Sequence, residues 1–167
     1  RGILVLFMTA SILDGGLDFS NASASAIYGI YAASVYLATL PGGWIGDNLF
    51  GQQKTILYGG IIIMLGHLSL AIPNINSFYM GLILVVLGTG LLKPNISALV
   101  GSLYENNTEL RQSGFTIFYM AINIGSILGF FICGYLGENI GWHYGFGAAG
   151  IGMALGLMQY IYNMKLL

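Results

Sequence analysis

The sequence predicts an all-α membrane protein, because of its composition and the spacing of its polar residues. Of its 167 residues, 56% are hydrophobic and 7% are charged, and the mean hydropathy is +0.80. Soluble domains usually carry about 25% charged residues. The apolar runs lack the period-2 alternation of strands in a membrane β-barrel, and the 26 glycines suit helices that pack closely in lipid.

Six apolar segments are separated by short polar breaks. Because a helix crosses the hydrocarbon layer in about 20 residues, we expect one bundle over residues 1–167, with helices at about 2–13, 23–45, 54–72, 78–100, 113–136 and 144–164. The first segment is too short to cross, so we interpret it as the end of a truncated helix and the chain as a fragment. One cleavable signal peptide does not account for six such segments.

The basic residues predict the orientation of the bundle. Lysine and arginine concentrate in short cytoplasmic loops. If Arg1 is cytoplasmic, alternate loops place Lys54, Arg111 and Lys165 on that side too, and the opposite loops carry no lysine or arginine. We therefore expect both chain ends on the cytoplasmic side of the inner or plasma membrane.

Charge and cysteine content exclude several classes of protein. The net charge of −1 leaves too few basic groups to neutralise phosphates, so no nucleic-acid partner is expected. One cysteine, Cys133, can form neither an internal disulfide nor a cysteine metal site within the chain. No expected helix shows paired aspartates, metal-spaced histidines or a Ser/His dyad, so an intramembrane enzyme is disfavoured.

Lys93 is the only charged residue between Lys54 and Glu105. An ammonium at the centre of a membrane helix costs about 2.5–3.5 kcal/mol on insertion scales, so it must be paired or functional. It lies about 22 Å along its helix from the outer end, and Pro94 predicts a bend beside it. The alternative is a lysine whose side chain extends to the cytoplasmic interface.

The connection between the second and third helices carries a compact motif. Small residues let two helix ends approach, Asp47 can cap the next helix or receive a basic partner, and Gly51 allows a tight turn. Gly43, Asp47, Gly51 and Lys54 resemble the loop motif of the major facilitator superfamily. Gln52 and Gln53 stand where that motif often has a basic residue, and the alternative is a simple interfacial turn.

Two longer stretches narrow the resemblance. Residues 43–56 resemble the first signature of the proton-dependent oligopeptide transporter family and residues 115–127 the second, with residues 90–97 between them. The resemblance implies a major facilitator fold of two six-helix bundles around a central substrate cavity. This chain is then the N-terminal six-helix bundle with its first helix truncated, and the C-terminal bundle is absent from it.

The resemblance also assigns site residues. Lys93 matches a lysine implicated in peptide binding and proton coupling, Asn123 an asparagine that bonds the peptide backbone, and Tyr36 a tyrosine that lines the pocket. Phe115, Tyr119 and Asn123 share one helix face, which places Tyr119 beside Asn123. The alternatives are an Asn123 that only bridges two helices and a Tyr36 that only packs. For His67, a hydrogen bond between helices is favoured over a proton relay.

The function implied is proton-coupled symport of di- and tripeptides by alternating access. Its partners are the peptide, protons, the lipid bilayer and the C-terminal half of the same chain; the proton is the coupling ion, and no cofactor or metal is expected. The first alternative is a related carrier for a non-peptide anion such as nitrate or a drug-like carboxylate. A structural or regulatory membrane protein is the remaining possibility.

Overall fold

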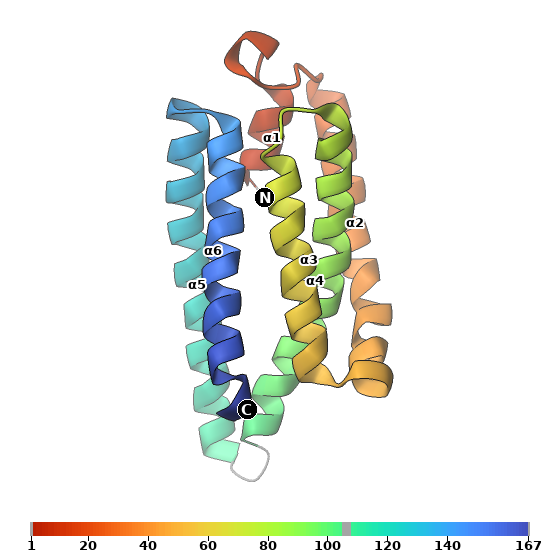
Figure 1. Ribbon diagram of the computed structural model, residues 1–167, viewed down its shortest axis with the longest axis vertical. Helices are drawn as coiled ribbons and strands as arrows, with labels where there is room; N and C mark the ends of the chain where they lie inside the picture. The colour runs from red at the N-terminus through yellow and green to blue at the C-terminus, as the bar shows by residue number, and fades with distance from the viewer. Residues whose placement is uncertain (1, 105–107, 167) are drawn as a thin grey trace.

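A computed structural model describes residues 2–104 and 108–166 as a bundle of helices aligned along one long axis (Figure 1). No strand occurs in these residues, so the all-α class is confirmed. The elements are α1 (Gly2–Thr9), η1 (Ile12–Asp14), α2 (Asn21–Ile45), η2 (Gly46–Phe50), α3 (Gln52–Leu70), α4 (Ile75–Leu103), α5 (Thr108–Asn139), α6 (Trp142–Asn163) and η3 (Met164–Leu166). Arg1, which the sequence predicts to be cytoplasmic, lies outside the described residues.

Several helices extend beyond the apolar segments that predict them. α4 begins at Ile75 because the side chain of Asn74 caps it, accepting the backbone N–H of Asn76 at 2.9 Å. α5 begins at Thr108, several residues before the predicted 113. Hydropathy excludes polar residues, whereas the backbone continues its hydrogen bonds through them. η2 is a π-helical continuation of α2 that hydropathy does not reveal.

The prediction for the first helix is wrong at its C-terminal end: α1 stops at Thr9 rather than near residue 13. The chain folds back on the helix there. Backbone N–H groups of residues 17–19 donate to the free carbonyls of Phe7, Met8 and Ala10 at 2.8–3.2 Å. These bonds satisfy the helix end without another helical turn.

Glycines bring α3 and α4 into close contact. A Cβ atom on Gly88 would lie 2.6 Å from the carbonyl oxygen of Gly59, and one on Gly66 would lie 3.0 Å from the backbone nitrogen of Val85. Side chains at these positions would therefore force the helices apart. Small residues at such interfaces increase van der Waals contact between helices in lipid.

An aromatic cluster closes one end of the bundle. The ring of Phe7 in α1 lies 5.3 Å from that of Phe146, 5.7 Å from that of Phe78 and 6.1 Å from that of Trp142. The indole N–H of Trp142 donates to the carbonyl of Asp14 at 3.1 Å. The cluster thus joins α1, α4 and α6 where the η1 connection crosses the bundle.

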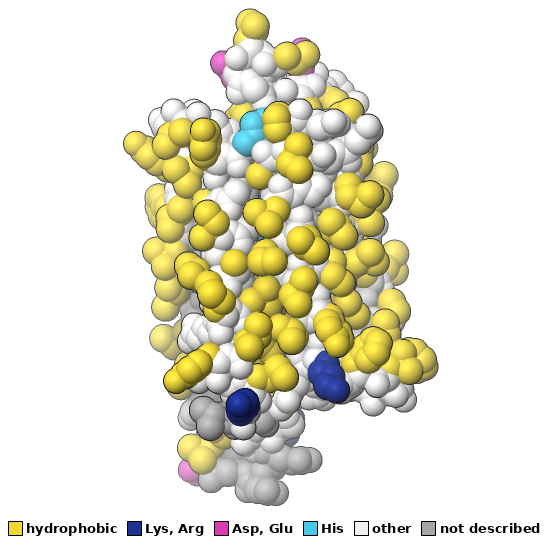
Figure 2. Space-filling model, in the orientation of Figure 1, with side chains coloured by type: hydrophobic (Ala, Val, Ile, Leu, Met, Phe, Trp, Pro, Cys, Tyr) yellow, Lys and Arg dark blue, Asp and Glu magenta, His cyan; other side chains and the backbone are white. Residues whose placement is uncertain are grey.

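The outside of the bundle is mostly apolar, with charge at its ends. Figure 2 shows a broad hydrophobic band and dark blue basic side chains at its lower end. By connection order, Lys54 at the start of α3 and Lys165 in η3 lie at the same end. Three described helical segments, Asn21–Phe50, Ile75–Leu103 and Thr108–Asn139, are long and apolar enough to cross a membrane. Spans for α3 and α6, which carry more polar ends, stay a prediction.

The glycine contact between α3 and α4 predicts that Gly88→Ala destabilises the protein by about 1–3 kcal/mol, the usual cost of overpacking. Thermal unfolding of the purified protein in detergent measures it. Gly152→Ala in α6 is the matched control, because a Cβ atom there meets nothing within 4 Å. Equal stability of the two variants would show that the backbones of α3 and α4 are not in contact.

Candidate functional site

α2 and α4 meet without side chains between them at one place. A Cβ atom on Gly42 would overlap the carbonyl oxygen of Gly90, and one on Gly90 would lie 2.6 Å from the Cβ of Ala38. A Cβ atom on Gly43 would lie 3.6 Å from the Cβ of Pro94. We call this the α2–α4 crossing and define it by Ala38, Gly42, Gly43, Gly46, Gly90, Pro94 and Asn95.

Each helix carries a proline at the crossing. Pro41 lies inside α2 and Pro94 inside α4. A proline removes one backbone donor and leaves the carbonyl four residues earlier without its helical partner. In α4 that carbonyl belongs to Gly90, which faces Gly42 across the crossing. The crossing therefore joins two locally weakened helix segments.

Lys93 and Tyr36, two of the predicted site residues, come together beside the crossing. The Lys93 Nζ atom lies 4.6 Å from the centroid of the Tyr36 ring. This distance is within the roughly 6 Å range of a cation–π interaction, which contributes about 0.5–1 kcal/mol at exposed sites. Tyr36 is 57% exposed, and Lys93 is exposed as well. The ammonium is thus held loosely and remains accessible.

The direction of the Lys93 side chain bears on the alternative of a lysine extended to the interface. α2 and α4 run parallel, because Gly90 faces Ala38 while Pro94 faces Gly43. Tyr36 precedes Gly43 by seven residues, or about 10 Å of helix. Lys93 therefore points back along the bundle, away from the end that carries Lys54 and Lys165. This direction is opposite to that of a side chain extended to the cytoplasmic interface.

Asn95 is the residue of this site that the sequence analysis missed. It is 1% exposed, and its side-chain amide donates to the carbonyls of Gly42 at 2.9 Å and Leu91 at 2.7 Å. The signal was present, because an amide in an apolar helix must find hydrogen-bond partners. Breaking a bond to such a buried group costs about 1–3 kcal/mol.

Tyr119 and Asn123 lie on α5, a different helix from those of Lys93 and Tyr36. α5 packs mainly against α6, and both residues are exposed on it. Tyr119 stacks on Phe115 with ring centroids 6.4 Å apart. Within the described ranges, the Asn123 side chain makes no hydrogen bond, so the suggested bridge between two helices is not formed.

The loop motif adopts a geometry that the sequence predicts only in part. Gly51 has a φ of 78°, a conformation that favours glycine, and joins η2 directly to α3. Asp47 does not cap α3: the cap position is Gly51, which offers no side chain. Asp47 lies within η2 and forms no ion pair with any residue that the structure describes. Lys54, in the first turn of α3, is exposed.

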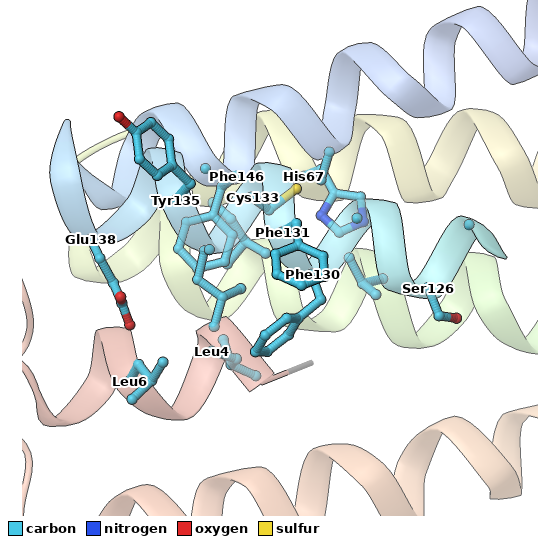
Figure 3. Close-up of a pocket in the computed structure, with 18 of the residues that line it drawn as sticks. Leu4, Leu6, His67, Ser126, Phe130, Phe131, Cys133, Tyr135, Glu138 and Phe146 are labelled. Carbon is cyan, nitrogen blue, oxygen red and sulfur yellow. The ribbon is translucent and has the colours of Figure 1, made fainter. Parts of the chain in front are cut away.

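A cavity of about 720 Å³ lies elsewhere, lined by residues of α1 to α6, with more of them on α5 than on any other helix. Figure 3 shows Phe130 and Phe131 of α5 near Leu4 of α1, with His67 of α3 facing the same space. The buried Nδ1 atom of His67 has no hydrogen-bond partner in the described part of the chain, so the expected bond between helices is absent at this nitrogen. None of the predicted substrate residues lines this cavity.

Comparison with known proteins decides the family. The model of the POT family matches residues 53–166, which is more than half of the chain. The chain belongs to the POT family. Its α2–α4 crossing is therefore a feature of a POT-type bundle, and the major facilitator fold expected from the sequence is confirmed.

Curated POT relatives match nearly all of the chain. It is 48% identical over 161 residues to the peptide transporter YePEPT of Yersinia enterocolitica, covering 95% of the chain and 32% of that protein. It is 46% identical over 166 residues to a di-/tripeptide transporter of Lactococcus lactis and to the uncharacterized transporter YclF of Bacillus subtilis. These matches cover 98% and 99% of the chain. The chain spans about a third of the length of these relatives.

Solved POT structures share the fold. A crystal structure of the peptide transporter POT in complex with sulfate superposes with a TM-score of 0.95 at 43% identity, over 99% of this chain and 34% of that one. A POT family transporter in complex with 5-aminolevulinic acid gives 0.90 at 35% identity, over 97% and 34%. The family and these relatives are transporters rather than enzymes.

The close approach of Gly43 and Pro94 predicts that the pair Gly43→Cys/Pro94→Cys forms a disulfide. Cβ atoms joined by a disulfide lie about 3.5–4.5 Å apart, and the expected separation here is 3.6 Å. Oxidation in a background free of other cysteines, including Cys133→Ser, followed by a thiol-labelling gel shift measures it. The control pair Gly43→Cys/Ala98→Cys lies one helical turn further and should stay reduced; equal bridging of both pairs would contradict this register.

Proposed function

We propose that the chain forms the N-terminal half of a proton-coupled symporter that carries di- and tripeptides across the cytoplasmic membrane. The observation that carries this proposal is the exposed ammonium of Lys93, 4.6 Å from the Tyr36 ring within an apolar bundle. Relatives named di-/tripeptide transporters support the choice of substrate. The symport partner is the proton, and no cofactor is proposed.

The chemistry of a short peptide suits these groups. A dipeptide at neutral pH carries one carboxylate, one ammonium and an amide core. The Lys93 ammonium offers a charge-assisted hydrogen bond to the carboxylate, which is stronger than a neutral one. The Tyr36 hydroxyl lines the same place, and Tyr119 and Asn123 on α5 offer phenol and amide groups to the peptide backbone.

Alternating access places further demands on the site. A ligand shifts the balance between outward-open and inward-open states only by its differential affinity for them. A carboxylate that draws Lys93 from Tyr36 changes a contact between α2 and α4, and this contact is one means of coupling binding to conformation. Protonation supplies the second input, through carboxylates that we place outside this chain.

The orientation follows from the positive-inside rule. Lys54 and Lys165 lie at one end of the bundle, whereas Asp14 lies in the connection at the other. We place the lysine end in the cytoplasm, with the bundle in the inner or plasma membrane. The loop motif then lies at the cytoplasmic end of the bundle, with Gly43 in α2, Asp47 in η2, Gly51 in the turn and Lys54 in α3. We propose that this motif changes conformation during the transport cycle.

A non-peptide carboxylate is the second candidate substrate. A POT family transporter similar to this chain has been solved with 5-aminolevulinic acid, which is a carboxylate without a peptide bond. The Lys93 ammonium can donate a hydrogen bond to the carboxylate of either substrate. The two substrates differ in their need for amide partners, which Asn123 supplies.

Replacing Lys93 tests the proposed function. Full-length transporter carrying Lys93→Ala in proteoliposomes should take up labelled dipeptide about 10- to 100-fold more slowly under an inward proton gradient, since a hydrogen bond to a charged group contributes about 1.5–3 kcal/mol. Lys165→Ala, an exposed lysine in η3, is the matched control and should transport normally. Dipeptide uptake unaffected by Lys93→Ala would remove Lys93 from the site, and wild-type uptake of 5-aminolevulinic acid without uptake of dipeptide would favour the second candidate.

Thiol labelling in intact cells tests the orientation. A membrane-impermeant maleimide should label Leu13→Cys, whose position is 98% exposed in the η1 connection, and should leave Lys165→Cys unlabelled. Both should react after the cells are lysed. Labelling of Lys165→Cys in intact cells would invert the proposed topology.

A further inference from the structure

Asn95 joins two helices through a polar contact inside the bundle. Its amide donates to the backbone of α2 at Gly42, 2.9 Å away, and to its own helix at Leu91, 2.7 Å away. At 1% exposure the side chain has no access to water as an alternative partner. The bond to Gly42 therefore fixes where α4 lies along α2.

The carboxamide oxygen of Asn95 lies against Gly46 at the end of α2, which has no side chain. A Cβ atom on Gly46 would overlap the Asn95 carboxamide oxygen. The N–H of Gly46 also donates to the carbonyl of Gly42, so this carbonyl accepts bonds from both helices. At the same residue α2 changes from an α-helix into the π-helical turn η2. Asn95 thus contacts α2 where its helical geometry changes.

The position of Lys93 depends on the same pair of helices. Lys93 precedes Asn95 by two residues, and its ammonium must reach the Tyr36 ring on α2. A cation–π contact between two exposed side chains is too weak to set the rotation of two helices. The buried amide bond and the glycine contacts can set it, and the exposed pair then follows from them.

We propose that Asn95 is a positioning residue of the substrate site. By holding α4 against the Gly42 carbonyl, it keeps the Lys93 ammonium beside Tyr36, where it receives the carboxylate of the substrate. This inference rests on the proposed function, and it adds a residue that touches no substrate but controls the affinity for the carboxylate end.

Asn95→Ser is the variant that isolates the contact between helices. A serine hydroxyl can donate to the carbonyl four residues earlier in its own helix, which here belongs to Leu91. The serine side chain is too short to reach the carbonyl of Gly42, so the bond between the two helices is lost. Leu99→Ala is the matched control, because Leu99 is a buried residue of α4 at 8% exposure one turn further on. If Asn95→Ser does not accumulate in the membrane, Asn95→Thr, whose hydroxyl bonds the same carbonyl of its own helix and whose methyl group fills more of the space, replaces it.

The readout compares two competitors of labelled dipeptide uptake by full-length transporter in proteoliposomes: an unlabelled dipeptide and the same dipeptide with an amidated C-terminus. Wild type should prefer the free carboxylate, and Lys93→Ala should lose this preference. Asn95→Ser should reduce the ratio of inhibition constants about tenfold, with a raised KM for the dipeptide, whereas Leu99→Ala should keep the wild-type ratio. An unchanged ratio in Asn95→Ser, even with lower uptake, would show a merely structural role and overturn the inference.

A second measurement separates this inference from the proposed function. If wild type takes up no peptide, the proposed function fails, and the labelling rate of Lys93 by an amine reagent, followed by mass spectrometry, decides the positioning role. Asn95→Ser should change that rate as Tyr36→Ala does, and Leu99→Ala should not. A wild-type rate in Asn95→Ser would overturn the inference whatever the substrate is.

Discussion

The close approach of the α2 and α4 backbones at Gly42 and Gly90 is the constraint on which the rest of the site depends. Lipid tails are as apolar as leucine, so helices in a bilayer associate through van der Waals contact and hydrogen bonds rather than through the hydrophobic effect. With no side chain between them, the helices bring the Gly42 carbonyl within 2.9 Å of the Asn95 amide. The same approach lets Lys93 reach Tyr36.

Other helices pack against α4 and so support its contact with α2. α3 packs on α4 through Gly59 and Gly88, and the cluster around Phe7 ties α1, α4 and α6 together. α5 is different, because its described surface, including Tyr119 and Asn123, is largely exposed. An exposed apolar helix with phenol and amide groups fits the cavity wall that the proposed function requires.

The sequence predicted the helices and drew attention to Lys93, because a charge within an apolar run carries a large energetic cost that its position in the sequence reveals. It did not predict the end of α1 at Thr9, the π-helical turn η2 or the loss of the Asp47 cap. These depend on backbone hydrogen bonds that hydropathy does not report. It also passed over Asn95, although an amide in an apolar helix signals a need for partners. That one partner is Gly42, 53 residues away, becomes visible only once the two helices are placed.

The partner of Lys93 is itself informative. Among the described residues, no aspartate or glutamate forms an ion pair with this lysine, and its neighbour is an aromatic ring. A fixed carboxylate in an apolar site would hold the ammonium strongly, and a substrate carboxylate would have to displace it. A ring face stabilises the cation by less, because its attraction is that of a quadrupole rather than a full charge. The proposed transport cycle, in which the site binds and releases a carboxylate, requires such a weaker resting partner, and the backbone contact between Gly42 and Gly90 keeps that partner in place.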